Sequence, residues 1–524
     1  RYSDFIVHEI NLDGNVVHLT NISFKEDAEV DEDGACLFTE EQLDVLKRLS
    51  GSPKESTEKF IVQVKDDKEV RTKMHNYIRN HFPKLSSETT SMNNEKNIIV
   101  TVGGNKRDNS KNHFRDYCKF VLYKENKSTM EAIQYISTIL RVNHSLFSFA
   151  GTKDKRAITT QEVTAYGVHP RKLAGLNKCL KNVTLGDFRT SKTPLKLGDL
   201  KGNHFEIIIR NLDGANVCIE NSLSMLKRNG FINYFGMQRF GATEVCNSRV
   251  GKCLIQSDWI TAIELILKPR NEENDLIMEC RKTWHETHDP SKALQALKNF
   301  SCIERKLLEG LCRHTPKNSV AALSYIPRNM RLMYLHAYQS LIWNKIVSKR
   351  FQTLKSEVLI GDLFQSSDDK SVSVVSEENI GYVKLTDVVL PLPGFDVKYP
   401  DNEIKIWYDE LLSSDGLHVN SFNHKIRDYS LSGSYRKIIV IPDVCNWRIL
   451  NYQNAENSLI ITDKDVMEGF SSSVENEGVN KALKLELSLP ASSYATMAIR
   501  EITKQDTSSA NQTLLTRNLD EFNK

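Results

Sequence analysis

The sequence has few residues that could cross-link it, hold a structural metal or enter a membrane. Its ten cysteines are scattered, without a Cys-x-x-Cys pair or a matching cysteine–histidine spacing, so neither a disulfide framework nor a zinc site is predicted. No apolar run approaches the roughly 18 to 20 residues that span a bilayer. No signal-peptide pattern opens the chain. We therefore expect no metal and no membrane segment, and the cysteines fit a reducing compartment.

The sequence also has no large excess of positive or negative charge, since its net charge is +3 over 524 residues. Global charge therefore says little about partners, and the local distribution must decide. A basic strip lies between His169 and His204, with Arg171, Lys172, Lys178, Lys181, Arg189, Lys192, Lys196 and Lys201 against Asp187 and Asp199. Such a strip suits nucleic-acid phosphates, although a solvated surface has the same composition. The acidic run Glu26–Asp33 would repel phosphate and should lie elsewhere.

The most informative segment is Gly151–Gln161, which sets one carboxylate, Asp154, among Lys153, Lys155 and Arg156. Nearby positive charge keeps a carboxylate ionised in a partly buried cleft, because it offsets the desolvation that would neutralise it. This is how a protein prepares an anionic nucleophile or base. A solvated turn could also read Lys-Asp-Lys. The apolar runs on both sides favour chemistry, since they predict a charged loop held by buried walls.

The segment Gly151–Gln161 resembles the G-x-K-D-x-x-A-x-T-x-Q motif of the TruD family of pseudouridine synthases, whose aspartate is the single catalytic residue. Asn233–Gly241 and Leu489–Glu501 match two further motifs of this family in the same order, and Arg1–Ile10 and Arg331–Asn344 are similar to two more of its blocks. The resemblance covers most of the chain and points to the eukaryotic type of the family.

The resemblance implies roles for four positions at the reacting base, and strand alternation adds a fifth. Asp154 would attack the sugar carbon or remove a ribose proton, and the sequence does not choose between these routes. Asn233 and Phe235 correspond to residues that contact the target nucleotide and stack near it. Tyr494 falls where the family places an aromatic ring over the uracil, and its hydroxyl could act as the base at C5. Arg156 would be the partner of Asp154 if the strand were regular there, because alternation puts residues i and i+2 on one side.

Other residues are expected to contact RNA around this centre. Phe5 and Glu9 resemble RNA-binding positions of eukaryotic relatives, although Phe5 could be a core residue and Glu9 an edge charge. Arg239 could pair with a phosphate or a carboxylate. The remaining RNA-binding candidates are Lys153, Lys155, Arg171, Lys172, Arg71 and His75. Arg71 and His75 form an Arg-x-x-x-His pair on one helical face. This spacing is similar to that of small α/β modules that bind single-stranded nucleic acid, although an exposed amphipathic helix explains it too.

The implied activity is isomerisation of uridine to pseudouridine without a cofactor. The expected substrate is tRNA, at uridine 13 and in pre-tRNA, and also snRNA and mRNA in a U-N-U-A-purine context. One active site per chain predicts a monomer, and the resemblance implies a location in the nucleus and cytoplasm. A start at Arg1 rather than Met indicates a trimmed N-terminal segment. The alternative is a non-catalytic RNA-binding or RNA-folding protein on the same scaffold.

The predicted fold is α+β, a pseudouridine synthase core with a mixed, mainly antiparallel sheet interrupted by two insertions. We assign the core to 1–28, 98–242 and 445–505, an α/β module to 29–97, a TRUD insertion domain to 243–444 and a polar tail to 506–524. Periodicity and turn residues predict a hairpin of Phe5–Ile10 with Val16–Ile22, helices at Asp67–Phe82 and Thr129–Leu140, and strands at Ile98–Val102, His204–Arg210 and Leu483–Leu489.

Overall fold

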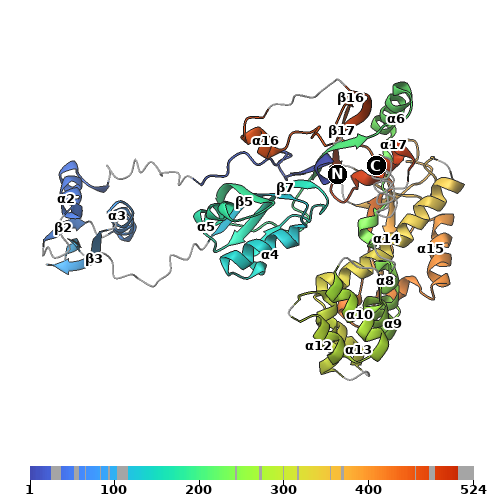
Figure 1. The fold of residues 1–524 in the computed structure, drawn as a ribbon, viewed down its shortest axis with the longest axis horizontal. Helices are drawn as coiled ribbons and strands as arrows, with labels where there is room; N and C mark the ends of the chain where they lie inside the picture. The colour runs from blue at the N-terminus through green and yellow to red at the C-terminus, as the bar shows by residue number, and fades with distance from the viewer. Residues whose placement is uncertain are drawn as a thin grey trace.

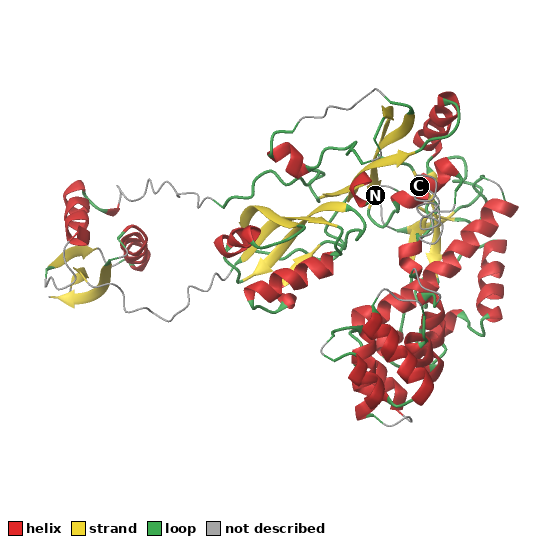
Figure 2. Cartoon of the chain, viewed as in Figure 1, coloured by secondary structure: helices red, strands yellow, loops and turns green. Residues whose placement is uncertain are grey.

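The fold is known from a computed structural model, in which three parts can be distinguished (Figure 1). They are a core built on one large sheet, a small α/β module, and an insertion domain that is mainly helical (Figure 2). The structure describes residues 1–24, 37–51, 58–64, 67–82, 84–92, 95–102, 116–241, 245–270, 274–298, 300–314, 318–354, 356–366, 371–454, 456–470 and 478–505. The acidic run at 26–33 and the tail at 506–524 lie outside these residues.

The core is an eight-stranded sheet in which β1 and β7 are parallel and the other pairs are antiparallel. This confirms the mixed, mainly antiparallel sheet. The strand predicted at Leu483–Leu489 returns to it next to the strand predicted at His204–Arg210. In sheet order the strands are β16 (Val444–Tyr452), β17 (Asn480–Pro490), β9 (Gly202–Arg210), β1 (Phe5–Ile10), β7 (Ile158–Tyr166), β5 (Tyr117–Glu125) and β8 (Val183–Ser191), with β6 (Phe147–Phe149) on β7.

The hairpin predicted at the start of the chain does not form. β1 pairs with β9 and β7 in the middle of the sheet, and the second segment makes only one bridge, between Val16 and Ile10. Val17 and Leu19 instead pack on one face of the sheet, and the amide of Leu19 donates to Asp463 in α16 (Asp463–Met467). Both edges of β1 are taken by distant strands, so the neighbouring segment serves as cover for the sheet.

Helices cover the opposite face of the sheet in two groups. α4 (Thr129–Leu140) and α5 (Pro170–Gly175) pack on β5 and β7, while α6 (Asn216–Asn229) and α17 (Ala495–Thr503) pack on β9 and β17. α4 has the bounds predicted from its apolar spacing, because Ser128 and Glu131 form a capping box and Arg141 ends the helix in the left-handed conformation. α17 contains the second half of the third motif, Leu489–Glu501, so this packing holds that motif on the sheet.

The small module has its own apolar core, around Leu46, Ile78 and Ile98. The predicted helix is present in it as α3, with Asp67 as its N-cap. The segment Ile98–Val102, which we assigned to the catalytic core, pairs with the module's other two strands, so the module extends to residue 102. Its elements are α2 (Glu40–Gly51), β2 (Lys59–Val64), α3 (Lys68–His81), β3 (Leu85–Met92) and β4 (Glu95–Val102).

The insertion domain follows β10 (Phe231–Ile232) and α7 (Met237–Phe240) and is built around one long buried helix, α14 (Arg328–Thr353). Around it are α8 (Asn247–Ile255), α9 (Trp259–Leu267), α10 (Asp275–Thr287), α11 (Pro290–Ala296), α12 (Ile303–Arg313), α13 (Ser319–Leu323) and α15 (Glu403–Ser414). A four-stranded sheet, ordered β12 (Val372–Val374), β11 (Leu363–Gln365), β13 (Val388–Leu392) and β14 (Ser434–Lys437), packs against α14. The chain returns to the core through β15 (Ile439–Val440), which pairs with β10. None of the described helices combines the length and apolarity that a membrane span needs.

Candidate active site

Asp154 lies in the loop between β6 and β7, where the chain is irregular until Ile158. Strand alternation therefore does not apply at Asp154, and the geometric argument for Arg156 as its partner no longer holds. Arg156 and Lys155 are both exposed, and the ammonium of Lys155 lies 2.9 Å from the carboxylate of Glu131. Any contact of these two residues with RNA remains a prediction.

Three hydrogen bonds fix the loop, and they involve Gln161 of its own motif and Thr129 of α4. The amide of Lys153 donates to Thr129 Oγ1 at 3.0 Å, and Thr129 Oγ1 donates to Gln161 Oε1 at 2.8 Å. Gln161 Nε2 donates back to the carbonyl of Gly151 at 2.9 Å. Thr129 and Gln161 are fully buried, so this network fixes the backbone of the loop at Gly151 and Lys153, directly before Asp154.

Lys153 and Glu9 form a buried ion pair, with Nζ and Oε2 2.7 Å apart. Glu9 also accepts from the amide of Glu162, and its pKa is raised because burial outweighs the attraction of Lys153. Glu9 is therefore a buried residue of a central strand rather than an edge charge. In this conformation the pair joins β1 to the loop. Phe5 is partly buried, with its ring edge-on to Phe205 at 5.9 Å between centroids.

Lys124 is a second buried cation next to the loop, and sequence reasoning did not single it out. Its Nζ donates to the carbonyl oxygens of Asp154 at 2.8 Å and Lys127 at 2.7 Å. The side chain comes from β5 and is fully buried, which lowers the pKa of its ammonium to about 8. The signal available in the sequence was a lysine at the end of an apolar strand, Phe120–Tyr123, but burial of its charge depends on the fold.

The carboxylate of Asp154 meets the second family motif through Gln238, whose Nε2 donates to Asp154 Oδ1. Gln238 is in α7, directly after the segment Asn233–Gly236. The motif that carries Asp154 and the motif that carries Asn233 and Phe235 are thus brought together, although 84 positions separate the bonded pair in the sequence. Gln238 stood within the quoted motif, but no role was assigned to it.

Phe235 and Tyr494, from the second and third motifs, pack against each other, with ring centroids 6.4 Å apart. A Cβ on Gly236 would lie 2.8 Å from Cδ1 of Tyr494, so the tyrosine ring rests on the backbone of Gly236 and glycine is required there for this packing. Asn233 is buried, and its Nδ2 donates to the carbonyl of Lys437 at 3.1 Å. The three motifs therefore form one site.

The outlying RNA-binding candidates are placed in different parts of the chain. Arg239 stands 5.4 Å from the ring centroid of Phe235 and belongs to the site. Arg171 and Lys172 are exposed on α5 of the core. His75, in α3 of the small module, has its ring nitrogens 2.8 Å from Ser87 Oγ and 2.7 Å from Thr89 Oγ1, on β3. Burial and the nearby Arg79 and Arg71 lower its pKa, so the neutral imidazole joins α3 to the sheet of the module.

His8, His18 and Asp463 are a group that could hold a metal ion, with one donor atom from each lying within 4.8 Å of the others. His8 precedes Glu9 on β1 and therefore faces the other side of the sheet from the Asp154 loop. Asp463 Oδ1 lies 3.1 Å from His8 Nε2 and 2.8 Å from His18 Nδ1, and Oδ2 accepts from Leu19 and Thr160. These bonds hold the pKa of Asp463 well below its usual range. These hydrogen bonds join β1 and β7 to α16 on the face of the sheet opposite the Asp154 loop.

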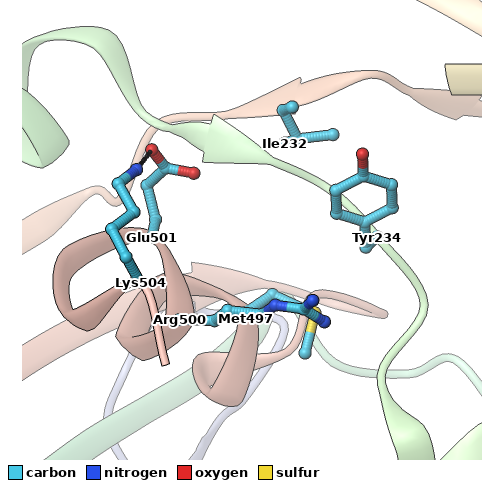
Figure 3. Close-up of a pocket in the computed structure, with 6 residues that line it drawn as sticks. All are labelled: Ile232, Tyr234, Met497, Arg500, Glu501 and Lys504. Atoms are coloured by element: carbon cyan, nitrogen blue, oxygen red, sulfur yellow. Dashed lines mark hydrogen bonds and ion pairs between the residues drawn. The ribbon is translucent and has the colours of Figure 1, made fainter. Parts of the chain in front are cut away.

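A small cavity lies next to the joined motifs, between β10 and α17 (Figure 3). Its volume is about 200 Å³, and its walls carry Tyr234, which precedes Phe235, and Met497, which lies one helical turn after Tyr494. In Figure 3 the guanidinium of Arg500 lies below the ring of Tyr234, and Glu501 is paired with Lys504. Ile232 completes the lining.

Comparison with known proteins agrees with this geometry. The family model described as "tRNA pseudouridine synthase D (TruD)" matches residues 95–502. The chain belongs to the TruD family of pseudouridine synthases. It is accordingly an isomerase that acts on RNA, and the resemblance read from its motifs is confirmed.

Relatives in this TruD family cover nearly the whole chain. The human pseudouridylate synthase 7 homolog is 44% identical over 525 residues, which are 98% of this chain and 79% of the human protein. The multisubstrate pseudouridine synthase 7 of Schizosaccharomyces pombe is 34% identical and aligns with 98% of this chain and 88% of its own length. The crystal structure of a TruD protein from Methanosarcina mazei is similar with a TM-score of 0.53 at 25% identity, over 75% of this chain and 88% of that one.

Proposed function

We propose that Asp154 is the catalytic residue with which this pseudouridine synthase isomerises uridine in tRNA, at uridine 13 and in pre-tRNA. We extend the proposal to snRNA and mRNA that carry a U-N-U-A-purine context. The observation that carries it is the contact of the Asp154 carboxylate with Gln238, beside the aromatic pair Phe235 and Tyr494. Gln238 and Phe235 belong to the second motif and Tyr494 to the third, so the Asp154 carboxylate contacts the motif that packs against Tyr494.

The reaction needs little more than such a carboxylate. The bond between ribose C1′ and uracil N1 breaks, C1′ joins C5, the proton on C5 leaves and N1 gains a proton, so no electrons are exchanged with another molecule. The uridine must first leave its stack, at a cost of a few kcal/mol. Phe235 and Tyr494 supply aromatic surface to receive the base, and Tyr494 has a hydroxyl for the proton at C5.

Several residues of the chain orient the Asp154 carboxylate. Lys124, Thr129 and Gln161 fix the loop backbone, and Gln238 holds one carboxylate oxygen. Within the part of the chain that the structure describes, no hydrogen bond engages the other oxygen, which serves for attack on the sugar carbon or for removal of a ribose proton. A carboxylate held in this way reacts without first having to be ordered.

The test uses a short RNA with a U-N-U-A-purine site and a tRNA transcript, with pseudouridine mapped after incubation with pure protein. Asp154→Ala should abolish product while binding the RNA as well as the unaltered protein does. Asp13→Ala, at an exposed carboxylate after β1, is the matched control and should be fully active. Product formation by Asp154→Ala would refute the role of Asp154. RNA binding without product in the unaltered protein would favour the non-catalytic alternative.

A further inference from the structure

Arg436, in β14 of the insertion domain, reaches out of its own domain and binds two of the catalytic motifs at once. Its Nε donates to the carbonyl of Asn233 at 2.8 Å, and its Nη2 donates to Asn233 Oδ1 at 2.7 Å. Its Nη1 donates to the carbonyl of Ser492 at 2.9 Å. All three nitrogens of one planar group are therefore used to hold the second motif against the third.

The flat face of the same guanidinium lies on the aromatic part of the site. Its central carbon is 3.9 Å from the ring centroid of Phe235 and 5.4 Å from that of Trp343. The side chain is 7% exposed, and burial lowers its pKa to about 10. It thus remains charged at neutral pH. Among the described residues no carboxylate lies within ion-pair distance, so carbonyl oxygens and ring faces supply its stabilisation.

The hydrogen bond from Arg436 to the carbonyl of Ser492 lies at a strained turn. Ser492 has φ of +68°, in the left-handed region that is unfavourable for a residue other than glycine. It stands two residues before Tyr494, so its conformation decides where that ring goes. The hydrogen bond from Arg436 to the carbonyl of Ser492 stabilises this turn.

The insertion domain also holds the second motif from another side. Asn344, in α14, accepts from the amide of Phe235 at 3.0 Å and donates to its carbonyl at 3.0 Å. Arg436 is fixed in turn by β13, because it pairs with Leu390. The position of the aromatic pair is therefore set by two elements of the insertion domain, α14 and β14.

We propose that Arg436 is a positioning residue for pseudouridine formation, which fixes the Asn233 and Tyr494 segments relative to each other so that the insertion domain shapes the uridine pocket of the core. The inference rests on the proposed function of this site. Arg436 itself takes no part in the chemistry, because each of its three nitrogens already donates to a carbonyl or amide oxygen of the protein.

Arg436→Lys tests this, because lysine keeps the charge but its single ammonium cannot reach both segments in the geometry of the guanidinium fork. We expect kcat to fall about 10- to 100-fold, the loss typical of a misplacement of about 1 Å. The dissociation constant for RNA should change less than about threefold. In Arg436→Ala, guanidinium ion at low millimolar concentration should restore part of the lost kcat. A purely structural loss would not respond in this way.

Arg281→Lys is the matched control, since Arg281 is a buried arginine of the same domain that pairs with Glu304 away from the motifs. It should melt lower and keep its kcat, without a response to guanidinium. If Arg436→Lys melts too low to assay, Arg436→Gln, which can still donate to Asn233, takes its place. Wild-type kcat in Arg436→Lys or in this substitute, with Asp154→Ala inactive, would overturn the inference while the proposed function stands. Activity in Asp154→Ala would overturn the proposed function instead.

Discussion

Replacement of Lys124 by methionine should make the stability of this protein less dependent on pH. Lys124 is fully buried, and its pKa falls from 10.5 to about 8 on folding. Below about pH 8 the ammonium is charged in both states, and the cost of burying it is fully present. Between about pH 8 and 10.5 the unfolded chain binds more protons at this site than the folded one, so this site makes stability rise with pH.

The size of the effect follows from the same two values. A difference of about 2.5 pH units corresponds to about 3.4 kcal/mol, at about 1.36 kcal/mol per unit. Methionine has a similar length and no charge, so Lys124→Met lacks this contribution. The difference in the free energy of unfolding, wild type minus variant, should therefore increase by up to about 3 kcal/mol between pH 7 and pH 10.5.

Urea unfolding of both proteins at several pH values from 7 to 10.5 measures this difference directly. Lys47→Met removes an ammonium whose side chain is 68% exposed, and it serves as the control for the loss of a lysine as such. Parallel curves of stability against pH for the wild type and Lys124→Met would refute the reasoning. In activity assays at pH 7, Lys124→Met should lower kcat, since Asp154 loses a backbone anchor, without weakening RNA binding.

Two further predictions concern the carboxylate and the basic strip. Gln238→Ala should lower kcat roughly 10-fold with little change in RNA affinity, because the Asp154 carboxylate loses the donor that orients it. Single-turnover assays measure the rate of the chemical step separately from RNA binding. An unchanged kcat would show that the contact is dispensable. Reversal of charge in Arg171→Glu with Lys172→Glu, on exposed α5, should weaken RNA binding and reduce its salt dependence by about two phosphate contacts. Titrations at several salt concentrations measure this, and a salt slope equal to that of the wild type would remove the strip from the RNA-binding surface.

Local signals were enough to place many elements. α4 was predicted with its observed bounds from its apolar spacing alone, because that signal lies within the segment itself. The alternating leucines of β17 likewise identified a strand with one buried face. The predictions were wrong where the partner of a strand had to be identified. Val16–Ile22 has the composition of a strand but finds both edges of β1 occupied, and Ile98–Val102 has its partners in the small module.

The amino-acid sequence by itself determined the family, the order of the motifs and the identity of Asp154 as the candidate catalytic residue, because each motif is a short string that can be read in isolation. Only the tertiary structure decided what surrounds that residue. The partner of Asp154 is 84 positions away, and Arg436 is 203 positions from Asn233. Burial of Lys124 beneath the loop depends on the carbonyl of Asp154, 30 positions away, being brought against β5. Such contacts arise from the path of the whole chain, and hydrogen bonds between distant side chains leave no periodic trace in the sequence.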